Sequence, residues 1–84
     1  MNVAVIGIGR IGLPLAAAIA RRGHHVFGCD INAERVAMVN AGQNPIPDEA
    51  GLADLIRDVI GSGALVATTD TVGAVAQCET VLFA

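Results

Sequence analysis

The sequence contains no lysine, tryptophan or tyrosine, and its formal net charge is −3. It therefore offers neither a basic surface to neutralise phosphates nor aromatic platforms on which bases stack, and we expect no nucleic-acid partner. The two cysteines, Cys29 and Cys78, form no C-x-x-C pair, and no histidine cluster accompanies them. This pattern argues against both a disulfide framework and a metal site.

Long hydrophobic runs are also missing. No apolar segment reaches the roughly 18–20 residues that span a bilayer, so we expect no membrane segment. The first twenty residues lack the basic start and small-residue cleavage site of a secretory signal, which favours a cytoplasmic location. Apolar residues are nonetheless abundant, at 54% of an 84-residue chain against 15% charged residues. This composition is typical of one small globular domain.

Short apolar runs alternate with helical patterns along the chain, which is typical of βαβ units and an α/β fold with a parallel sheet. The apolar runs predict strands at 3–6, 26–29, 65–68 and 80–84. The helical patterns predict helices at about 11–22, 32–41, 52–60 and 70–76. Since parallel strands of this kind bind ligands at their carboxyl ends, we expect a chain that stops at its fourth strand to be the first half of a larger domain.

Residues 7–12 follow the pattern G-x-G-x-x-G, with the sequence Gly7-Ile8-Gly9-Arg10-Ile11-Gly12. The pattern lies between a predicted strand and a predicted helix, the context in which it indicates dinucleotide binding. Gly7 permits a tight turn, Gly9 lets a pyrophosphate approach the backbone, and Gly12 lets helix and strand pack closely. The amino end of the helix then faces the phosphates with free N–H groups and a positive dipole.

Asp30 ends the second predicted strand, 18 residues after Gly12. A carboxylate at this position accepts hydrogen bonds from the two hydroxyls of the adenine ribose and repels a 2′-phosphate. Together with the glycines it predicts NAD rather than NADP as the cofactor, bound by a Rossmann-type parallel sheet of order 3-2-1-4 flanked by helices. The alternative is that the glycines serve only a tight turn and that Asp30 is a solvated strand end.

The whole chain resembles the N-terminal part of the UDP-glucose/GDP-mannose dehydrogenase family. The likeness is carried by VIGIGRIGLPLA at 5–16, GCDIN at 28–32, NAG at 40–42, PIP at 45–47, GL at 51–52 and ATTD at 67–70. The resemblance implies oxidation of the C6 alcohol of a UDP-sugar to the carboxylate with two NAD, as in polysaccharide biosynthesis. The stretch Gly12-Leu13-Pro14 is more similar to the UDP-N-acetylmannosamine branch than to the UDP-glucose branch.

The resemblance also implies which residues of this chain hold NAD. It places the loop 7–12, including Ile8, Arg10 and Ile11, at the cofactor, and adds Ile31 and Arg35 beside Asp30. Arg35 is expected either to reach the ribose hydroxyls, to pair with Asp30, or to be a solvated helix charge. Two positions depart from the family pattern: Arg10 stands where Tyr is usual, and Ala50 where Pro is common.

No catalytic residue is expected within this chain. In the family, the thioester cysteine and its Lys, Asn and Asp partners lie beyond the segment that these 84 residues match, as does the sugar-nucleotide domain. Cys29 and Cys78 are therefore expected to be packing residues. Asp48 and Glu49 are interpreted as first-turn helix acids and His24 and His25 as surface residues. We expect the isolated chain to be catalytically inactive and a UDP-sugar to bind only the full-length enzyme.

Two other interpretations remain at this point. Arg10 within the glycine motif, followed by Arg-Arg-Gly-His at 21–24, is also similar to the non-enzymatic nucleotide-sensing domains that regulate potassium channels and transporters. Those domains usually carry a Gly-Asp-Ala-Thr-like turn where this chain has ATTD at 67–70. The second is a β-hydroxyacid dehydrogenase of the 6-phosphogluconate type, although its motif typically has Met in place of Ile11.

Whichever interpretation holds, an exposed edge of the fourth strand would favour a homo-oligomer.

Overall fold

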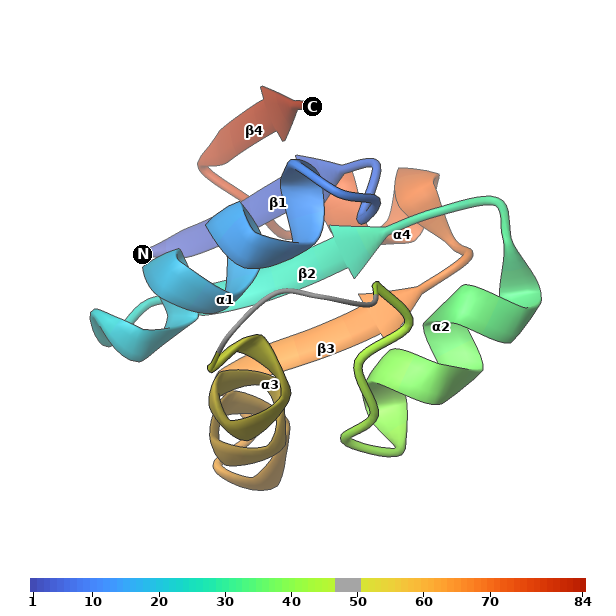
Figure 1. Ribbon diagram of the computed structural model, residues 1–84. Coiled ribbons are helices and arrows are strands. Elements are labelled where there is room, and N and C mark those ends of the chain that lie inside the picture. The colour runs from blue at the N-terminus through green and yellow to red at the C-terminus, as the bar shows by residue number, and fades with distance from the viewer. Residues whose placement is uncertain (47–50) are drawn as a thin grey trace.

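The computed structural model describes residues 1–46 and 51–84, which form four strands and four helices (Figure 1). The strands are β1 (Asn2–Ile6), β2 (His25–Cys29), β3 (Leu65–Thr68) and β4 (Thr80–Phe83). The helices are α1 (Gly12–Arg21), α2 (Ala33–Asn40), α3 (Leu52–Gly61) and α4 (Thr71–Ala76). Each predicted element is present, and no boundary differs from its prediction by more than one residue. Asp48 and Glu49 lie outside the described residues.

The four strands form one parallel sheet in the order β3-β2-β1-β4, which confirms the predicted topology. In the register of the sheet, Ile6 at the end of β1 lies beside Cys29 of β2 on one side and Phe83 of β4 on the other. The carboxyl ends of these strands are therefore level with one another. This alignment brings the glycine motif that follows β1 and the aspartate that follows β2 to the same edge of the sheet.

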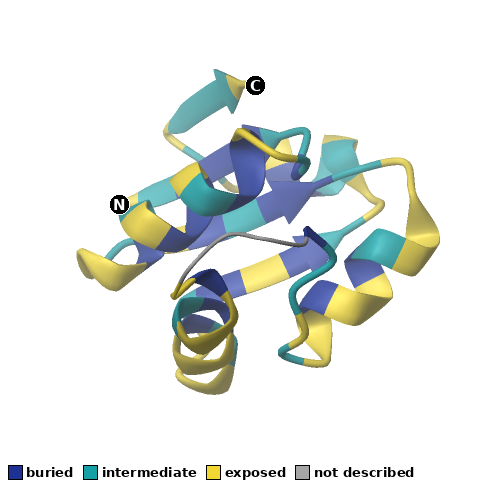
Figure 2. Cartoon of the chain, in the orientation of Figure 1, coloured by how far each residue is buried: buried dark blue, intermediate teal, exposed yellow. Residues whose placement is uncertain are grey.

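The helices cover the sheet from two sides, because successive strand residues point to opposite faces. Val3 and Val5 of β1 belong to the main core, which α1, α2 and α3 complete, and Ala4 between them belongs to a smaller cluster that contains Ala74 of α4. Figure 2 shows the buried residues concentrated between the sheet and the layer that contains α1 and α3. Within the described residues, no helix is long and apolar enough to cross a membrane.

The outer edge of β3 is held by the side chain of Asn40, the last residue of α2. Its amide nitrogen donates to the Ala67 carbonyl at 2.8 Å, and its amide oxygen accepts from the Ala67 N–H at 2.9 Å. One side chain thus pairs both main-chain groups of a buried residue that has no strand on that side. Sequence reasoning missed this contact, which ties α2 to the sheet next to the site.

We predict that Asn40→Ala lowers the free energy of unfolding by about 1–2 kcal/mol, because it leaves the buried N–H and C=O of Ala67 without a protein partner. Urea unfolding followed by circular dichroism measures this change. Gln43→Ala is the matched control: Gln43 is exposed and nearby, and its loss should change the free energy of unfolding by no more than about 0.5 kcal/mol. Equal changes in the free energy of unfolding for the two substitutions would contradict a stabilising contact between Asn40 and Ala67.

Candidate functional site

The glycine motif forms the connection between β1 and α1, at the carboxyl edge of the sheet. Gly7 leaves β1 with a φ of +94°, a conformation that side chains strongly disfavour, and its N–H donates to the Cys29 carbonyl at 2.7 Å. Gly12 opens α1 against this turn, and a Cβ on Gly12 would lie 1.6 Å from the Gly7 carbonyl oxygen. Both glycines are therefore required by the backbone of this chain itself.

Gly9 is different, because the protein's own packing does not require a glycine there. Its φ lies outside the left-handed region. A Cβ at this position would meet only the Nη1 atom of Arg35, at the ordinary contact distance of 3.7 Å. A small side chain would thus fit in the free protein. The absence of one leaves open space beside the loop, which is the feature that a pyrophosphate needs.

The amino end of α1 is open to an anion. Asn32 caps α2 and Asp70 caps α4 by accepting backbone N–H groups, whereas Ile11 at the start of α1 makes no side-chain cap. The first turn of α1 also contains no acidic residue. Leu13 and Leu15 already donate their N–H groups to the carbonyls of Gly9 and Ile11, and Pro14 has no N–H, so the Gly12 N–H and the positive dipole end of α1 remain for a negatively charged ligand.

The other loop residues differ in what they can offer. Arg10 and Ile11 are exposed, Ile11 to 74%, so both side chains lie at the surface of the loop. Ile8 is fully buried in the main core, so its side chain is excluded from any ligand contact and only its main chain belongs to the site. The sequence motif does not distinguish these cases, because it fixes only the glycines.

Asp30 lies directly after β2, and its carboxylate faces the glycine loop. Oδ2 accepts from the Ile8 N–H at 3.1 Å, and Oδ1 accepts from the Asn32 N–H at 2.9 Å. Arg35, one turn into α2, forms an ion pair with Oδ2 at 3.6 Å, and only 13% of the Asp30 side chain is exposed. Of the roles expected for Arg35, the free protein therefore shows the pairing with Asp30.

The environment of Asp30 keeps its carboxylate ionised. Burial of the side chain opposes ionisation, but the N–H groups of Asn32 and Ile8 and the positive charge of Arg35 outweigh it. The pKa of Asp30 is accordingly lower than the ordinary value of 3.8. A charged acceptor therefore lies at the edge of the loop at physiological pH.

A hollow of about 270 Å³ opens beside Asp30, between the carboxyl ends of β1, β2 and β4. It is flanked by two exposed apolar side chains, Ile31 at 95% and Phe83 at 84% exposure. Its full lining is Ile6, Gly7, Cys29, Asp30, Ile31, Thr71, Phe83 and Ala84. Sequence reasoning named Ile31 but missed Thr71, Phe83 and Ala84. These three residues follow the carboxyl ends of β3 and β4, and that position could have indicated them, because parallel sheets bind ligands at this edge.

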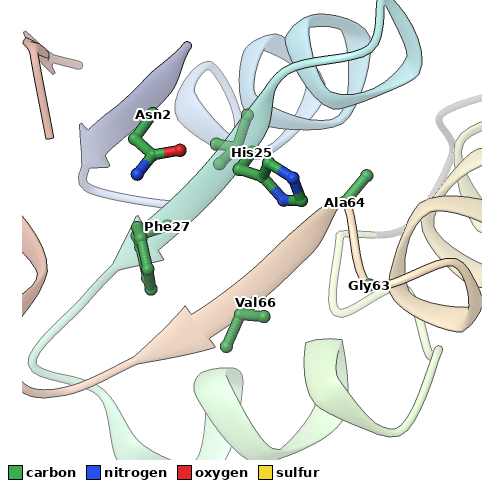
Figure 3. Close-up of a pocket in the computed structure, with 7 residues that line it drawn as sticks. Asn2, His25, Phe27, Gly63, Ala64 and Val66 are labelled. Atoms are coloured by element: carbon green, nitrogen blue, oxygen red, sulfur yellow. The ribbon is translucent and has the colours of Figure 1, made fainter. Parts of the chain in front are cut away.

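A second hollow, of about 260 Å³, lies at the opposite end of the strands (Figure 3). Its lining includes Asn2 and His25, the first residues of β1 and β2, and the loop that enters β3. Ligands of parallel sheets bind at the carboxyl ends of the strands, so this hollow has the wrong position for a cofactor. The charged groups described above do not line it.

The cysteines and histidines do not join the site chemically. Burial raises the pKa of the Cys29 thiol, and it also raises the pKa of the Cys78 thiol. Both thiols are therefore poor nucleophiles. Both pack in the small cluster around Ala4, with Cys29 buried and Cys78 partly buried. His25 is exposed at the far end of β2. The described residues contain no group of His, Cys, Asp and Glu that would hold a metal ion.

The lowered pKa of Asp30 predicts how its contribution to stability depends on pH. A carboxylate whose pKa falls on folding stabilises the native state above its unfolded pKa, and the contribution disappears as the pH drops through the folded pKa. Asp30→Asn should thus be less stable than the natural chain at neutral pH, with the difference shrinking between about pH 5 and about pH 2. Urea titrations at each pH measure this, and a constant difference would contradict it.

Comparisons with known proteins agree with this geometry. Residues 1–84 match the model of the UDP-glucose/GDP-mannose dehydrogenase family, NAD binding domain. GDP-mannose 6-dehydrogenase of Azotobacter vinelandii is 37% identical over 94% of this chain, and UDP-N-acetyl-D-mannosamine dehydrogenase of Salmonella typhimurium is 43% identical over 87%. The crystal structure of GDP-mannose dehydrogenase from Pseudomonas aeruginosa superposes on the whole chain with a TM-score of 0.96 at 31% identity.

The chain spans only 18% and 17% of the two curated relatives and 19% of the crystallised one. These matches give no support to the alternative of a potassium-channel or transporter sensor. They account instead for the fold and for the match over the whole chain. The chain belongs to the UDP-glucose/GDP-mannose dehydrogenase family, of which it is an NAD-binding domain.

Proposed function

We propose that the loop 7–12, together with Asp30, Ile31 and Arg35, binds the adenosine diphosphate half of NAD. The observation that carries this proposal is the open space beside Gly9, a glycine that the protein's own packing does not require. On one side of this space is the uncapped amino end of α1, and on the other is the ionised Asp30. The same space thus offers groups for an anion and for a sugar diol.

The diphosphate lies, in this proposal, between Gly9 and the start of α1. The Gly12 N–H and the positive dipole end of the helix face its oxygens, and the missing side chain of Gly9 allows the close approach that this requires. Arg10 supports this position, since its exposed guanidinium follows Gly9 directly and balances part of the negative charge. Ile11, exposed beside it, contributes its main chain and shields the phosphates from one side.

The ribose and the adenine fit the groups around Asp30. An ionised carboxylate offers about four lone-pair sites, of which the two N–H groups of the free protein use two, while Arg35 forms an ion pair with Oδ2. Both ribose hydroxyls can therefore donate to Asp30 while these N–H bonds persist. The adjoining hollow between Ile31 and Phe83 has apolar walls suited to a flat base.

We propose further that residues 1–84 are the N-terminal half-domain of a cytoplasmic nucleotide-sugar 6-dehydrogenase. Oxidising a primary alcohol to a carboxylate removes four electrons, so it takes two hydride transfers and two NAD. Relatives named for GDP-mannose and for UDP-N-acetyl-D-mannosamine support a nucleotide-sugar substrate. The stretch Gly12-Leu13-Pro14 favours a UDP-sugar among them. Self-association belongs to the same proposal, since β4 is the last strand on its side of the sheet within the described residues.

The decisive test is a calorimetric titration of this chain with NAD⁺. We expect saturable binding that Gly9→Val abolishes, because the added methyl groups fill the space of the diphosphate. Gly61→Val is the matched control, since Gly61 lies in α3 and a Cβ there would meet open space. Both variants should keep the circular dichroism spectrum of the natural chain. Unchanged affinity in Gly9→Val would show that the cofactor binds elsewhere.

A second prediction concerns the reaction. The chain mixed with NAD⁺ and a UDP-sugar should form no NADH, because the described residues contain no activated nucleophile: both thiols have a raised pKa. Absorbance of the reduced nicotinamide measures this directly. NADH formation by the pure chain would overturn the assignment of a cofactor-holding role without catalytic residues.

A further inference from the structure

The outer face of α1 is apolar although it faces solvent. Residues 12–20 contain no polar side chain, and a helix that is apolar on all sides is normally buried on all sides. The inner side of α1 packs in the main core, whereas Leu15 and Ala18 are exposed on its outer side, Leu15 to 39%. Charge enters only where the helix ends, at Arg21 and Arg22, which are both exposed. This face is therefore suited to contact another protein surface.

Helix α3 packs beside α1 in the same layer and adds the opposite charge (Figure 1). Leu55 of α3 is half-buried, and Asp58 is exposed about one turn further along the helix. A hollow of about 420 Å³ separates the outer sides of the two helices, and its lining includes Arg21, Leu55 and Asp58. Neither ion pair found among the described residues involves Arg22 or Asp58. The layer thus presents an apolar strip with a cation on one helix and an anion on the other.

The two helices run in the same direction, and their ends are level. Each helix leads into the next of two parallel strands, α1 into β2 and α3 into β3. Both helices end four residues before the strand that follows them. Leu15 therefore lies at the level of Leu55, since each is six residues from the end of its helix. By the same count, Arg22 lies about one turn beyond the level of Asp58, which is within the reach of an arginine side chain.

We propose that two copies of this chain associate about a twofold axis parallel to α1 and α3, with α1 of each copy packed on α3 of the other. A rotation about this axis preserves the direction and the level of both helices. It therefore brings Leu15 onto Leu55 of the second copy and Arg22 to Asp58 of the second copy. Each contact occurs twice, as in any isologous interface. The small side chain of Ala18 allows the helix axes to approach to the roughly 8–10 Å of packed helices.

The charges of this face favour a second copy over other occupants. In the twofold pair, the arginine of each copy meets the aspartate of the other, and the apolar strips cover one another. A nucleic acid or an anionic membrane would be attracted by Arg22 alone, but it is repelled by Asp58 and by the net charge of −3. The face is also distinct from the loop 7–12 and from β4, so the inference does not depend on the proposed NAD site.

The test measures the mass of the chain in solution by sedimentation, between about 1 µM and about 1 mM. The natural chain should form pairs within this range. Arg22→Glu and Asp58→Arg should each weaken pairing about tenfold or more, because each substitution places two like charges opposite one another. Glu34→Arg is the matched control: it reverses an exposed acid on α2, outside this face, and should leave the pairing unchanged. Circular dichroism should show the natural fold in all three variants.

Mixing Arg22→Glu with Asp58→Arg tests the pairing of the two helices directly. In a mixed pair, each substituted side chain faces an opposite charge on the other copy, and the unsubstituted arginine faces the unsubstituted aspartate. An equimolar mixture should therefore recover about the natural affinity, although each variant alone is weakened. A natural chain that stays monomeric up to about 1 mM overturns the inference. Pairing that neither reversal weakens lies on another surface, such as β4, and overturns it as well, as does a mixture without recovery.

Discussion

The site depends on the close contact between Gly12 and the carbonyl of Gly7. A single Cβ at residue 12 would lie 1.6 Å from that oxygen, so no other amino acid lets α1 begin where it does. This contact fixes the amino end of α1 directly above the carboxyl end of β1. The uncapped start of the helix, the space beside Gly9 and the position of the Ile8 N–H opposite Asp30 all follow from it.

The three glycines of the motif are therefore needed for different reasons, which the sequence pattern alone does not distinguish. Gly7 and Gly12 are needed to fold the connection, and a protein that bound nothing would need them as well. Gly9 alone is not required by the folded chain, and for this reason the proposed NAD site rests on it. The alternative in which the glycines serve only a tight turn therefore accounts for Gly7 and Gly12 and gives no reason for a glycine at residue 9.

Much of the fold was predictable because the signals were local. Periodicity located the strands and helices, and Asn32 and Asp70 cap α2 and α4 as their positions next to apolar runs indicate. The contacts missed are those between distant parts of the chain. Asn40 and Ala67 are 27 residues apart, and the hollow beside Asp30 is completed by residues from β4. No local pattern reports such pairings. Sequence reasoning likewise left the partner of Arg35 open, and only the packing of α2 against the edge of the sheet decides it.

The amide of Asn40 has a consequence for how this sheet can grow. By satisfying both main-chain groups of Ala67, it occupies the outer edge of β3 at that residue, so a strand that approached there would first have to displace it. Stacking of copies into a continuous ribbon requires two free edges on each molecule. A single side-chain amide, by occupying one of these edges at Ala67, therefore works against such stacking on the β3 side.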